Sequence, residues 1–171
     1  NGCGFDVIIG NPPYVNTEGM HALLPSAEVE VYKKKYKTSH KQFDKYFIFI
    51  EQAINKINEN GLVCYIVPNK FFKIGAGEKL RNLIAKERML VSLDDFGDAQ
   101  LFEDKTIYSS IILLSKAKQT SFVYSSVDSA NKLWAGEEVS SIKLNSSVLN
   151  KLPWRLTTDF EFLTMLQRLD E

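Results

Sequence analysis

Ten residues near the start of the chain limit its fold most tightly, because an apolar run there stops abruptly at Gly, Asn and two prolines. They span residues 5–14 and read F-D-V-I-I-G-N-P-P-Y. The run from Phe5 to Ile9 predicts a short strand that is too continuously apolar to have one face in water. Gly10 can adopt backbone angles that are closed to other residues, which favours a sharp turn. The stretch therefore predicts a buried strand followed by a fixed turn.

The turn is expected to present two hydrogen-bond acceptors beside an aromatic ring. Neither proline has an N–H, and Pro13 favours an extended backbone at Pro12. The carbonyl of Pro12 and the side-chain oxygen of Asn11 then lie together, with Tyr14 behind them. If each oxygen accepts one N–H of a planar substrate amine, the nitrogen is drawn toward tetrahedral geometry and its lone pair is freed for an electrophile. Asn is not a strong base, so this is positioning and electrostatic stabilisation. The alternative is a plain Pro-Pro turn after a strand.

At these residues the chain resembles a known family, the S-adenosylmethionine-dependent amino-methyltransferases, in particular the DNA N6-adenine type. The resemblance continues through D-K-Y-F-I-F-I-E-Q-A, N-G-L-V-C-Y-I-V-P-N-K-F-F and L-D-D-F-G-D-A-Q-L-F-E-D-K-T-I-Y-S-S-I-I-L-L-S-K. It runs in register from about Phe5 to Lys116, and it is similar above all to the gamma-class and type IIG restriction-modification enzymes. It implies methyl transfer to the exocyclic amine of an adenine that is flipped out of double-stranded DNA.

The resemblance also implies roles for individual residues. Asn11, Pro12 and Tyr14 correspond to the catalytic motif. Tyr14 and Phe102 correspond to the aromatic residues that stack on opposite faces of the flipped adenine. Phe49 corresponds to the ring beside the adenine of the cofactor, and Asn11 also lies near the cofactor. For Phe49, ordinary core packing is the alternative, because helix aromatics are usually buried.

Composition sets further bounds. The 171 residues, 44% hydrophobic and 25% charged, are those of an ordinary globular protein. The net charge of zero gives no sign of a nucleic-acid partner. Cys3 and Cys64 have no C-x-x-C spacing, which argues for a reducing compartment and against a disulfide scaffold. With only His21 and His40 to join them, we expect no metal site. The sequence has no signal peptide or apolar run of membrane length, and we expect a cytoplasmic location.

Periodicity predicts an α/β fold, namely a partial Rossmann-like methyltransferase sheet with a C-terminal extension. No clean period is found over residues 15–42, which we expect to form a long functional or mobile connection. The strongest helix pattern covers 43–60 and ends at Asn60-Gly61. The other expected elements are strands over 62–67, 89–96, 106–115 and 122–124, and a helix over 76–86.

Lysines and tyrosines interleave at residues 32–37, directly after the presumed target-base motif. Such a pattern can bind phosphates and stack on bases, although a solvated helix end would look similar. The candidate DNA contacts are Lys33, Lys34, Lys35, Lys37, Lys41 and Lys105.

We expect residues 1–118 to form the C-terminal half of a methyltransferase catalytic domain. Residues 119–171 are expected to form a linker, with Ser and Asn clustered over 125–150 and a helix within 156–169, that leads to a DNA target-recognition domain. The glycine-containing cofactor loop of the family precedes the N-P-P-Y strand, so this chain alone is expected to lack most of the cofactor site and to be inactive. The strand of residues 5–9 would then be a bare edge, which favours self-association.

Two other functions are compatible with the residues. An N-P-P-Y methyltransferase could act on a protein glutamine amide or an RNA base, although the lysine-tyrosine segment and the long tail favour DNA. A non-catalytic DNA-recognition module is the other alternative, against which the intact motif speaks. Asp95-Phe96-Gly97 spells a kinase motif, but no Gly-rich loop or H-R-D accompanies it, and we discount that interpretation.

Overall fold

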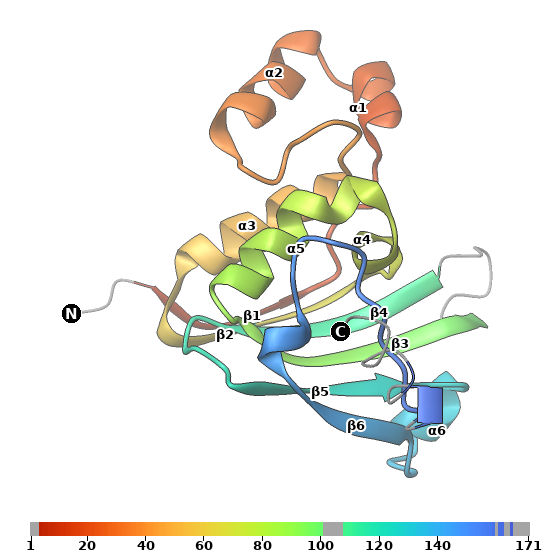
Figure 1. Cartoon of the computed structure of the whole chain (residues 1–171). Helices are drawn as coiled ribbons and strands as arrows, with labels where there is room; N and C mark the ends of the chain where they lie inside the picture. The colour runs from red at the N-terminus through yellow and green to blue at the C-terminus, as the bar shows by residue number, and fades with distance from the viewer. Residues whose placement is uncertain (1–3, 101–107, 160, 163–164, 166–171) are drawn as a thin grey trace.

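The computed structural model describes residues 4–100, 108–159, 161–162 and 165, and it confirms the expected α/β fold (Figure 1). Within these residues, six strands form one sheet in the order β1-β2-β4-β3-β5-β6. The strands are β1 Phe5–Gly10, β2 Ile57–Pro68, β3 Leu90–Gln100, β4 Tyr108–Ser115, β5 Ser121–Ser126 and β6 Ser140–Asn145. β1 is parallel to β2 and β3 to β5, whereas the pairs β2–β4, β3–β4 and β5–β6 are antiparallel.

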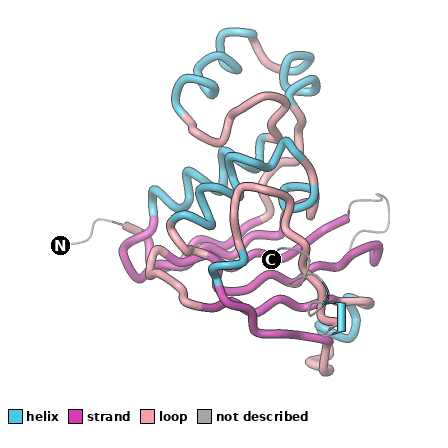
Figure 2. The backbone as a smooth tube through the Cα atoms, viewed as in Figure 1, coloured by secondary structure: helices cyan, strands magenta, loops and turns pink. Residues whose placement is uncertain are grey.

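Most of the helices lie on one side of this sheet, as Figure 2 shows, whereas the short helix of residues 130–134 lies at the end of the sheet. They are α1 Thr17–Leu23, α2 Ser26–Lys35, α3 Lys45–Lys56, α4 Lys70–Lys73, α5 Glu78–Lys86 and α6 Ala130–Trp134, with short 3-10 turns at Gly75–Gly77 and Ser146–Val148. α3 and α5 lie against the sheet, and α1 and α2 stand beyond them as a separate helical lobe of residues 16–44 (Figure 1). The connection expected to be irregular over 15–42 is therefore largely helical.

α3 ends earlier than the sequence predicts, and β2 begins earlier. The helix stops at Lys56, and residues 57–61 belong to β2 instead of the helix. Phe5 pairs with Ile57, and the register then shifts before Val7 pairs with Leu62. Gly61 permits this irregularity, because a Cβ there would lie 2.8 Å from the Phe5 carbonyl oxygen. Pairing with β1 thus overrides the Asn60-Gly61 helix-stop signal.

The two faces of the sheet differ in burial, which corrects the expectation that the first strand is buried on both sides. Facing α3 and α5, β2 and its neighbours bury Val63, Val67, Ile112 and Leu93. On the opposite face, Val7 is 51% exposed and Ile9 is 77% exposed. Among the described residues, β1 is also the last strand of the sheet and is paired with β2 on one side only. The first strand is therefore an edge strand whose apolar side chains face outward.

The region expected to be a linker is largely structured. β5 continues the sheet from β3, and β6 pairs with β5 from Ser121↔Asn145 to Ser126↔Ser140. Trp154 then packs its ring on Phe71 and Phe72, so the chain returns to the helix layer. Half of the residues 156–169, where a helix is expected, lie outside the described residues, and residues 161, 162 and 165 are helical. Whether a recognition domain follows stays a prediction.

The exposed edge strand gives a testable prediction of self-association. The apolar row of β1 offers unpaired main-chain groups and apolar side chains to a second copy, and a lysine within an edge strand discourages such pairing. We expect the chain to associate in sedimentation velocity runs at micromolar concentrations, and Val7→Lys to shift it toward the monomer.

Val31→Lys is the matched control, because Val31 is 55% exposed but lies on α2, away from the sheet edge. If both lysine variants sediment like the parent sequence, association through β1 is refuted.

Candidate functional site

The N-P-P-Y residues lie where β1 ends, next to the parallel strand β2. Asn11 is exposed, Pro12 is buried and Tyr14 is partly buried. Gly10 pairs with Tyr65 of β2, and a Cβ on Gly10 would lie 3.3 Å from the Tyr65 ring. Positive φ angles occur at Gly97 and Gly136 and not at Gly10, so the expectation of an unusual backbone angle there is wrong. Gly10 is instead suited to its position by its small size.

The hydroxyl of Tyr14 joins the motif to the adjacent strand. It lies within hydrogen-bond distance of Asn11 Oδ1 and of the Ile66 carbonyl oxygen, the latter at 2.9 Å. Burial raises the pKa of Tyr14 to about 12, so the hydroxyl keeps its proton at neutral pH. The structure therefore brings Asn11 and Tyr14 into direct contact.

A second tyrosine supports the ring of Tyr14. The ring of Tyr46, on α3, meets that of Tyr14 edge to face, with 6.1 Å between the ring centroids. Tyr46 is fully buried and donates a 3.3 Å hydrogen bond to the Pro68 carbonyl oxygen at the end of β2. Because aromatic pairs favour this edge-to-face geometry, the Tyr14 ring rests on a rigid neighbour.

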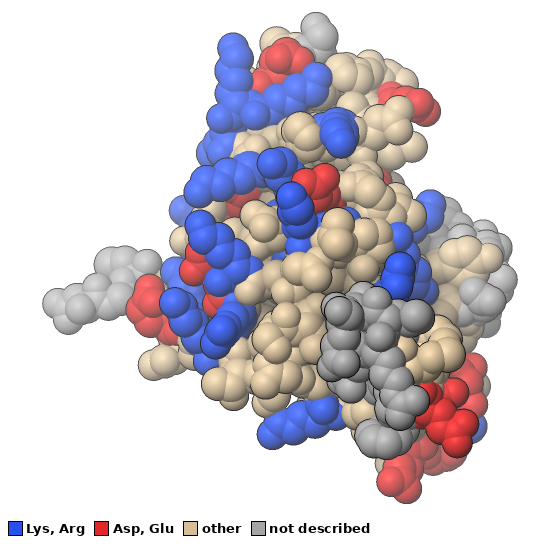
Figure 3. All heavy atoms as spheres, in the orientation of Figure 1, with Lys and Arg blue, Asp and Glu red and all other residues tan. Residues whose placement is uncertain are grey.

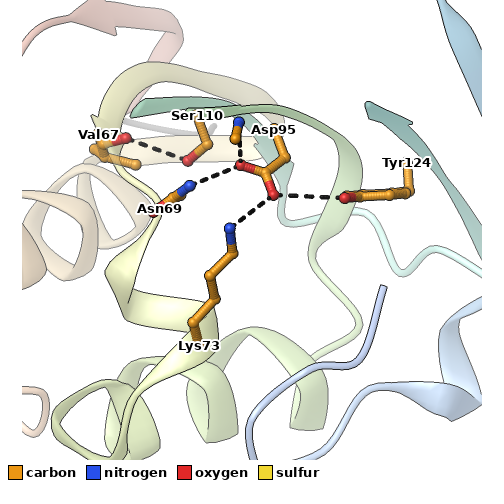
Figure 4. Close-up of polar contacts among 7 residues, drawn as sticks. Val67, Asn69, Lys73, Asp95, Ser110 and Tyr124 are labelled. Atoms are coloured by element: carbon orange, nitrogen blue, oxygen red, sulfur yellow. Dashed lines mark hydrogen bonds and ion pairs between the residues drawn. The ribbon is translucent and has the colours of Figure 1, made fainter. Parts of the chain in front are cut away.

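A buried polar cluster that the sequence did not predict lies just after β2 and on the strands β3 and β5, as Figure 4 shows. Asp95 is 6% exposed, and its Oδ1 accepts hydrogen bonds from Asn69 Nδ2 at 2.8 Å and Gly97 N at 3.1 Å. Its Oδ2 lies 3.1 Å from Lys73 Nζ and 3.5 Å from the Tyr124 hydroxyl. The sequence did contain a sign of this cluster, because Asp95 and Asn69 each lie close to the end of a predicted strand.

The lysine-rich segment belongs to the helical lobe, and its base is closed by hydrogen bonds. Asn16 and Asp44 form an isolated β-bridge, and Lys45 N donates to the Val15 carbonyl oxygen at 2.8 Å. The entry and the exit of the lobe are therefore held side by side, directly behind N-P-P-Y.

A buried carboxylate on α3 fixes the far side of the lobe. Glu51 is 6% exposed and accepts hydrogen bonds from Lys37 N at 3.0 Å, from Thr38 N at 2.8 Å and from the Thr38 hydroxyl at 2.8 Å. The Tyr36 hydroxyl adds a 2.9 Å bond to Gln52. These contacts replace the mobile connection expected from the sequence with an anchored one.

The predicted DNA-contact lysines of the lobe are exposed. Lys33, Lys34 and Lys35 form the last turn of α2, as expected for the alternative of a solvated helix end. Lys37 and Lys41 follow the helix. Figure 3 shows Lys and Arg side chains gathered over α2, α3 and α5, while acidic side chains gather at the opposite end near α6. On the face shown in Figure 3, charge is therefore unevenly distributed, although some acidic side chains lie among the basic ones. Lys105 lies outside the described residues.

The two predicted aromatic partners of the site have different outcomes. Phe49 is 38% exposed, although the neighbouring Phe47 and Ile50 on α3 are buried, so it is not an ordinary core residue. Phe102 lies outside the described residues, and its stacking role stays a prediction. The described part of the chain holds no cluster of three or more metal-ligating side chains, and none of its helices is long and apolar enough to cross a membrane.

Comparison with known proteins finds a matching family model and a similar sequence. Residues 1–102 match the model of the Eco57I restriction-modification methylase family. The Escherichia coli type II restriction enzyme and methyltransferase RM.Eco57I is 41% identical over 89% of this chain, which spans 15% of that protein.

Solved structures share the fold at low sequence identity. A Listeria monocytogenes protein assigned to the class I S-adenosylmethionine-dependent methyltransferases matches with a TM-score of 0.57 and 18% identity, over 78% of this chain and 40% of that one. The protein of the DrdV–DNA complex matches with a TM-score of 0.65 and 17% identity, over 91% of this chain and 18% of that one.

The Asp95 cluster predicts a large loss of stability on substitution. Asp95→Ala would leave the buried amide of Asn69 without its acceptor and Lys73 without its counter-ion. We expect the free energy of unfolding to fall by about 2–4 kcal/mol, since Lys73 is partly solvated. Urea denaturation followed by circular dichroism would measure it.

The control is Asp128→Ala, which removes an exposed ion pair with Lys132 and is expected to cost less than about 0.5 kcal/mol. Equal losses in the two variants would contradict a structural role for the buried carboxylate.

Proposed function

This chain belongs to the Eco57I restriction-modification methylase family, and from that membership we propose that it holds the target base in a DNA adenine-N6 methyltransferase. The observation that carries the proposal is the exposed Asn11 side chain at the end of β1, in contact with Tyr14 and next to Pro12. In this proposal the enzyme acts in the cytoplasm as part of a restriction-modification system. Residues 1–118 form the C-terminal half of its catalytic domain, and the tail leads to a DNA target-recognition domain.

Asn11 and Pro12 act in this proposal as the two acceptors for the adenine amine. Each accepts one N–H, so the nitrogen lone pair is no longer delocalised into the ring and becomes nucleophilic. S-adenosylmethionine, when bound, would supply a methyl group carried on a sulfonium sulfur. The carbon–sulfur bonding pair would leave with that sulfur as the nitrogen lone pair bonds to the methyl carbon. The amine then loses one proton to solvent. The contribution of Asn11 and Pro12 is positioning and electrostatic stabilisation.

Phe49 is suited to contact the cofactor. Its ring is the large exposed apolar side chain of α3, a helix that otherwise buries its aromatic residues. A planar purine could stack on such a ring, because the ring is 38% exposed and aromatic faces favour stacking. Phe49 and Asn11 are therefore the residues of this chain that would hold S-adenosylmethionine.

The lysines of the helical lobe would bind the phosphates of double-stranded DNA. They are exposed, they come from an anchored segment, and Figure 3 shows them joined by the basic side chains over α3 and α5. Phosphate contacts of this kind fix register and orientation without reading sequence. Lys105 is proposed as a further contact on the basis of the sequence alone.

The first test is Asn11→Ala in the full-length protein. Losing one of the two acceptors should lower the rate of methyl transfer by about two to three orders of magnitude, while the affinity for DNA changes far less. Tritium transfer from labelled S-adenosylmethionine to unmethylated plasmid DNA, and to protein substrates, would measure the rate and the substrate class.

Asn55→Ala is the control, because Asn55 is an exposed residue of α3 remote from the motif in sequence. Near wild-type DNA methylation by Asn11→Ala would remove Asn11 from the mechanism.

The second test concerns the two aromatic residues proposed to hold the base. Tyr14→Ala and Phe102→Ala should each weaken base binding by about 1–3 kcal/mol, the usual range for stacking on an aromatic side chain. Fluorescence of 2-aminopurine at the target position would report the extruded base. Phe102→Trp and Tyr14→Phe should keep the signal, because both retain a ring, and a full signal from Phe102→Ala would exclude Phe102 from the pocket.

A further inference from the structure

The hydroxyl of Tyr14 meets more acceptors than it can serve. A phenol carries one proton, and this one lies near both Asn11 Oδ1 and the Ile66 carbonyl oxygen. Both of these oxygens are acceptors, and the hydroxyl has a single proton, so it donates to one oxygen at a time. Stacking of the Tyr14 ring on a base would not require either contact.

Both ways of placing the proton constrain the Asn11 amide. When the hydroxyl donates to Asn11 Oδ1, one lone pair of that oxygen is used and the other remains for a substrate N–H. When it donates to Ile66, the Tyr14 oxygen can accept from Asn11 Nδ2 after the amide turns over, and Oδ1 then points elsewhere. The two orientations are isosteric. The same hydroxyl therefore controls which end of the amide faces an incoming amine.

We propose that the Tyr14 hydroxyl is a positioning group that holds the Asn11 side chain with its oxygen toward the substrate amine. This inference rests on the proposed function, and it separates the hydroxyl of Tyr14 from its ring. The ring would bind the base, whereas the hydroxyl would act on the rate through Asn11.

The surroundings of Tyr14 suit such a role. The edge-to-face contact with Tyr46 fixes the ring, and the Ile66 carbonyl belongs to β2, where Ile66 also pairs with Ile111 of β4. Asn11, in contrast, is an exposed residue at a strand end. A hydrogen bond to an exposed neutral amide adds little to the stability of the fold. Its consequence lies in the orientation of the amide.

Tyr14→Phe in the full-length protein tests the proposal, since it removes the hydroxyl and keeps the ring. With unmethylated plasmid DNA and labelled S-adenosylmethionine, we expect kcat to fall about three- to tenfold, the equivalent of one neutral hydrogen bond. KM for DNA should stay within about twofold of wild type, because the ring still stacks. An unchanged kcat would overturn the proposal.

Tyr46→Phe is the matched control. It also removes one hydroxyl that donates to a β2 carbonyl, that of Pro68, and it keeps the neighbouring ring. Its kcat should stay close to wild type. A fall equal to that of Tyr14→Phe would show that loss of any hydroxyl in this region slows the reaction, which would overturn the specific role.

A double-mutant cycle decides whether the hydroxyl acts through Asn11. If it does, Tyr14→Phe has no further effect on kcat once Asn11 is already Ala. If the double variant is slower than Asn11→Ala by the full three- to tenfold factor, the two groups act independently and the proposal fails.

A measurement without turnover separates this proposal from the proposed function. In protein labelled with 15N-asparagine, the side-chain amide signals of Asn11 should move in Tyr14→Phe and stay in place in Tyr46→Phe. Unmoved signals in Tyr14→Phe would overturn the positioning role. If Asn11→Ala methylates normally while the signals move as expected, the proposed function fails and the contact stands.

Discussion

The parallel pairing of β1 with β2 is the contact on which the site depends. It runs from Val7↔Leu62 to Gly10↔Tyr65, so the chain leaves β1 beside the last residues of β2. Tyr14 then reaches the Ile66 carbonyl oxygen, and Tyr46 reaches that of Pro68. A slip of one residue would turn the side chains of β1 to the other face of the sheet. The register of β1 against β2 therefore sets the position of the N-P-P-Y motif, independently of the contacts that its side chains make.

The end of the sheet that carries the motif is also stabilised from its other strands. Asp95, within β3, is hydrogen-bonded to Asn69 after β2, to Gly97 and to Tyr124 of β5, and its carboxylate is almost completely removed from water. Buried polar groups that are fully paired make a local structure rigid and unique. The Asp95 cluster and the pair of Tyr14 and Tyr46 therefore stabilise the same end of the sheet, the first by electrostatic contacts and the second by an aromatic contact.

The sequence predicted the elements well where local pattern and tertiary environment agree. The strand ending at Gly10, the helix after Asp44 and the strands near 90 and 110 follow from apolar periodicity, and the family was identified from the motif. Prediction failed where a partner distant in sequence decides the outcome. Ile57 is in a strand because Phe5 pairs with it, and Thr38 is ordered because Glu51 accepts its N–H. The contact of Tyr14 with Ile66 spans 52 residues and leaves no mark in local sequence.

The closed base of the helical lobe has a consequence for how such proteins can diverge. Because Val15 and Lys45 are bonded to each other and Asn16 bridges Asp44, the chain enters and leaves the lobe at almost the same point. Insertions or deletions between α1 and α2 would therefore change the reach and charge of the lobe while the spacing between β1 and α3 stays the same. The length of the lobe is thus uncoupled from the geometry of the residues before and after it.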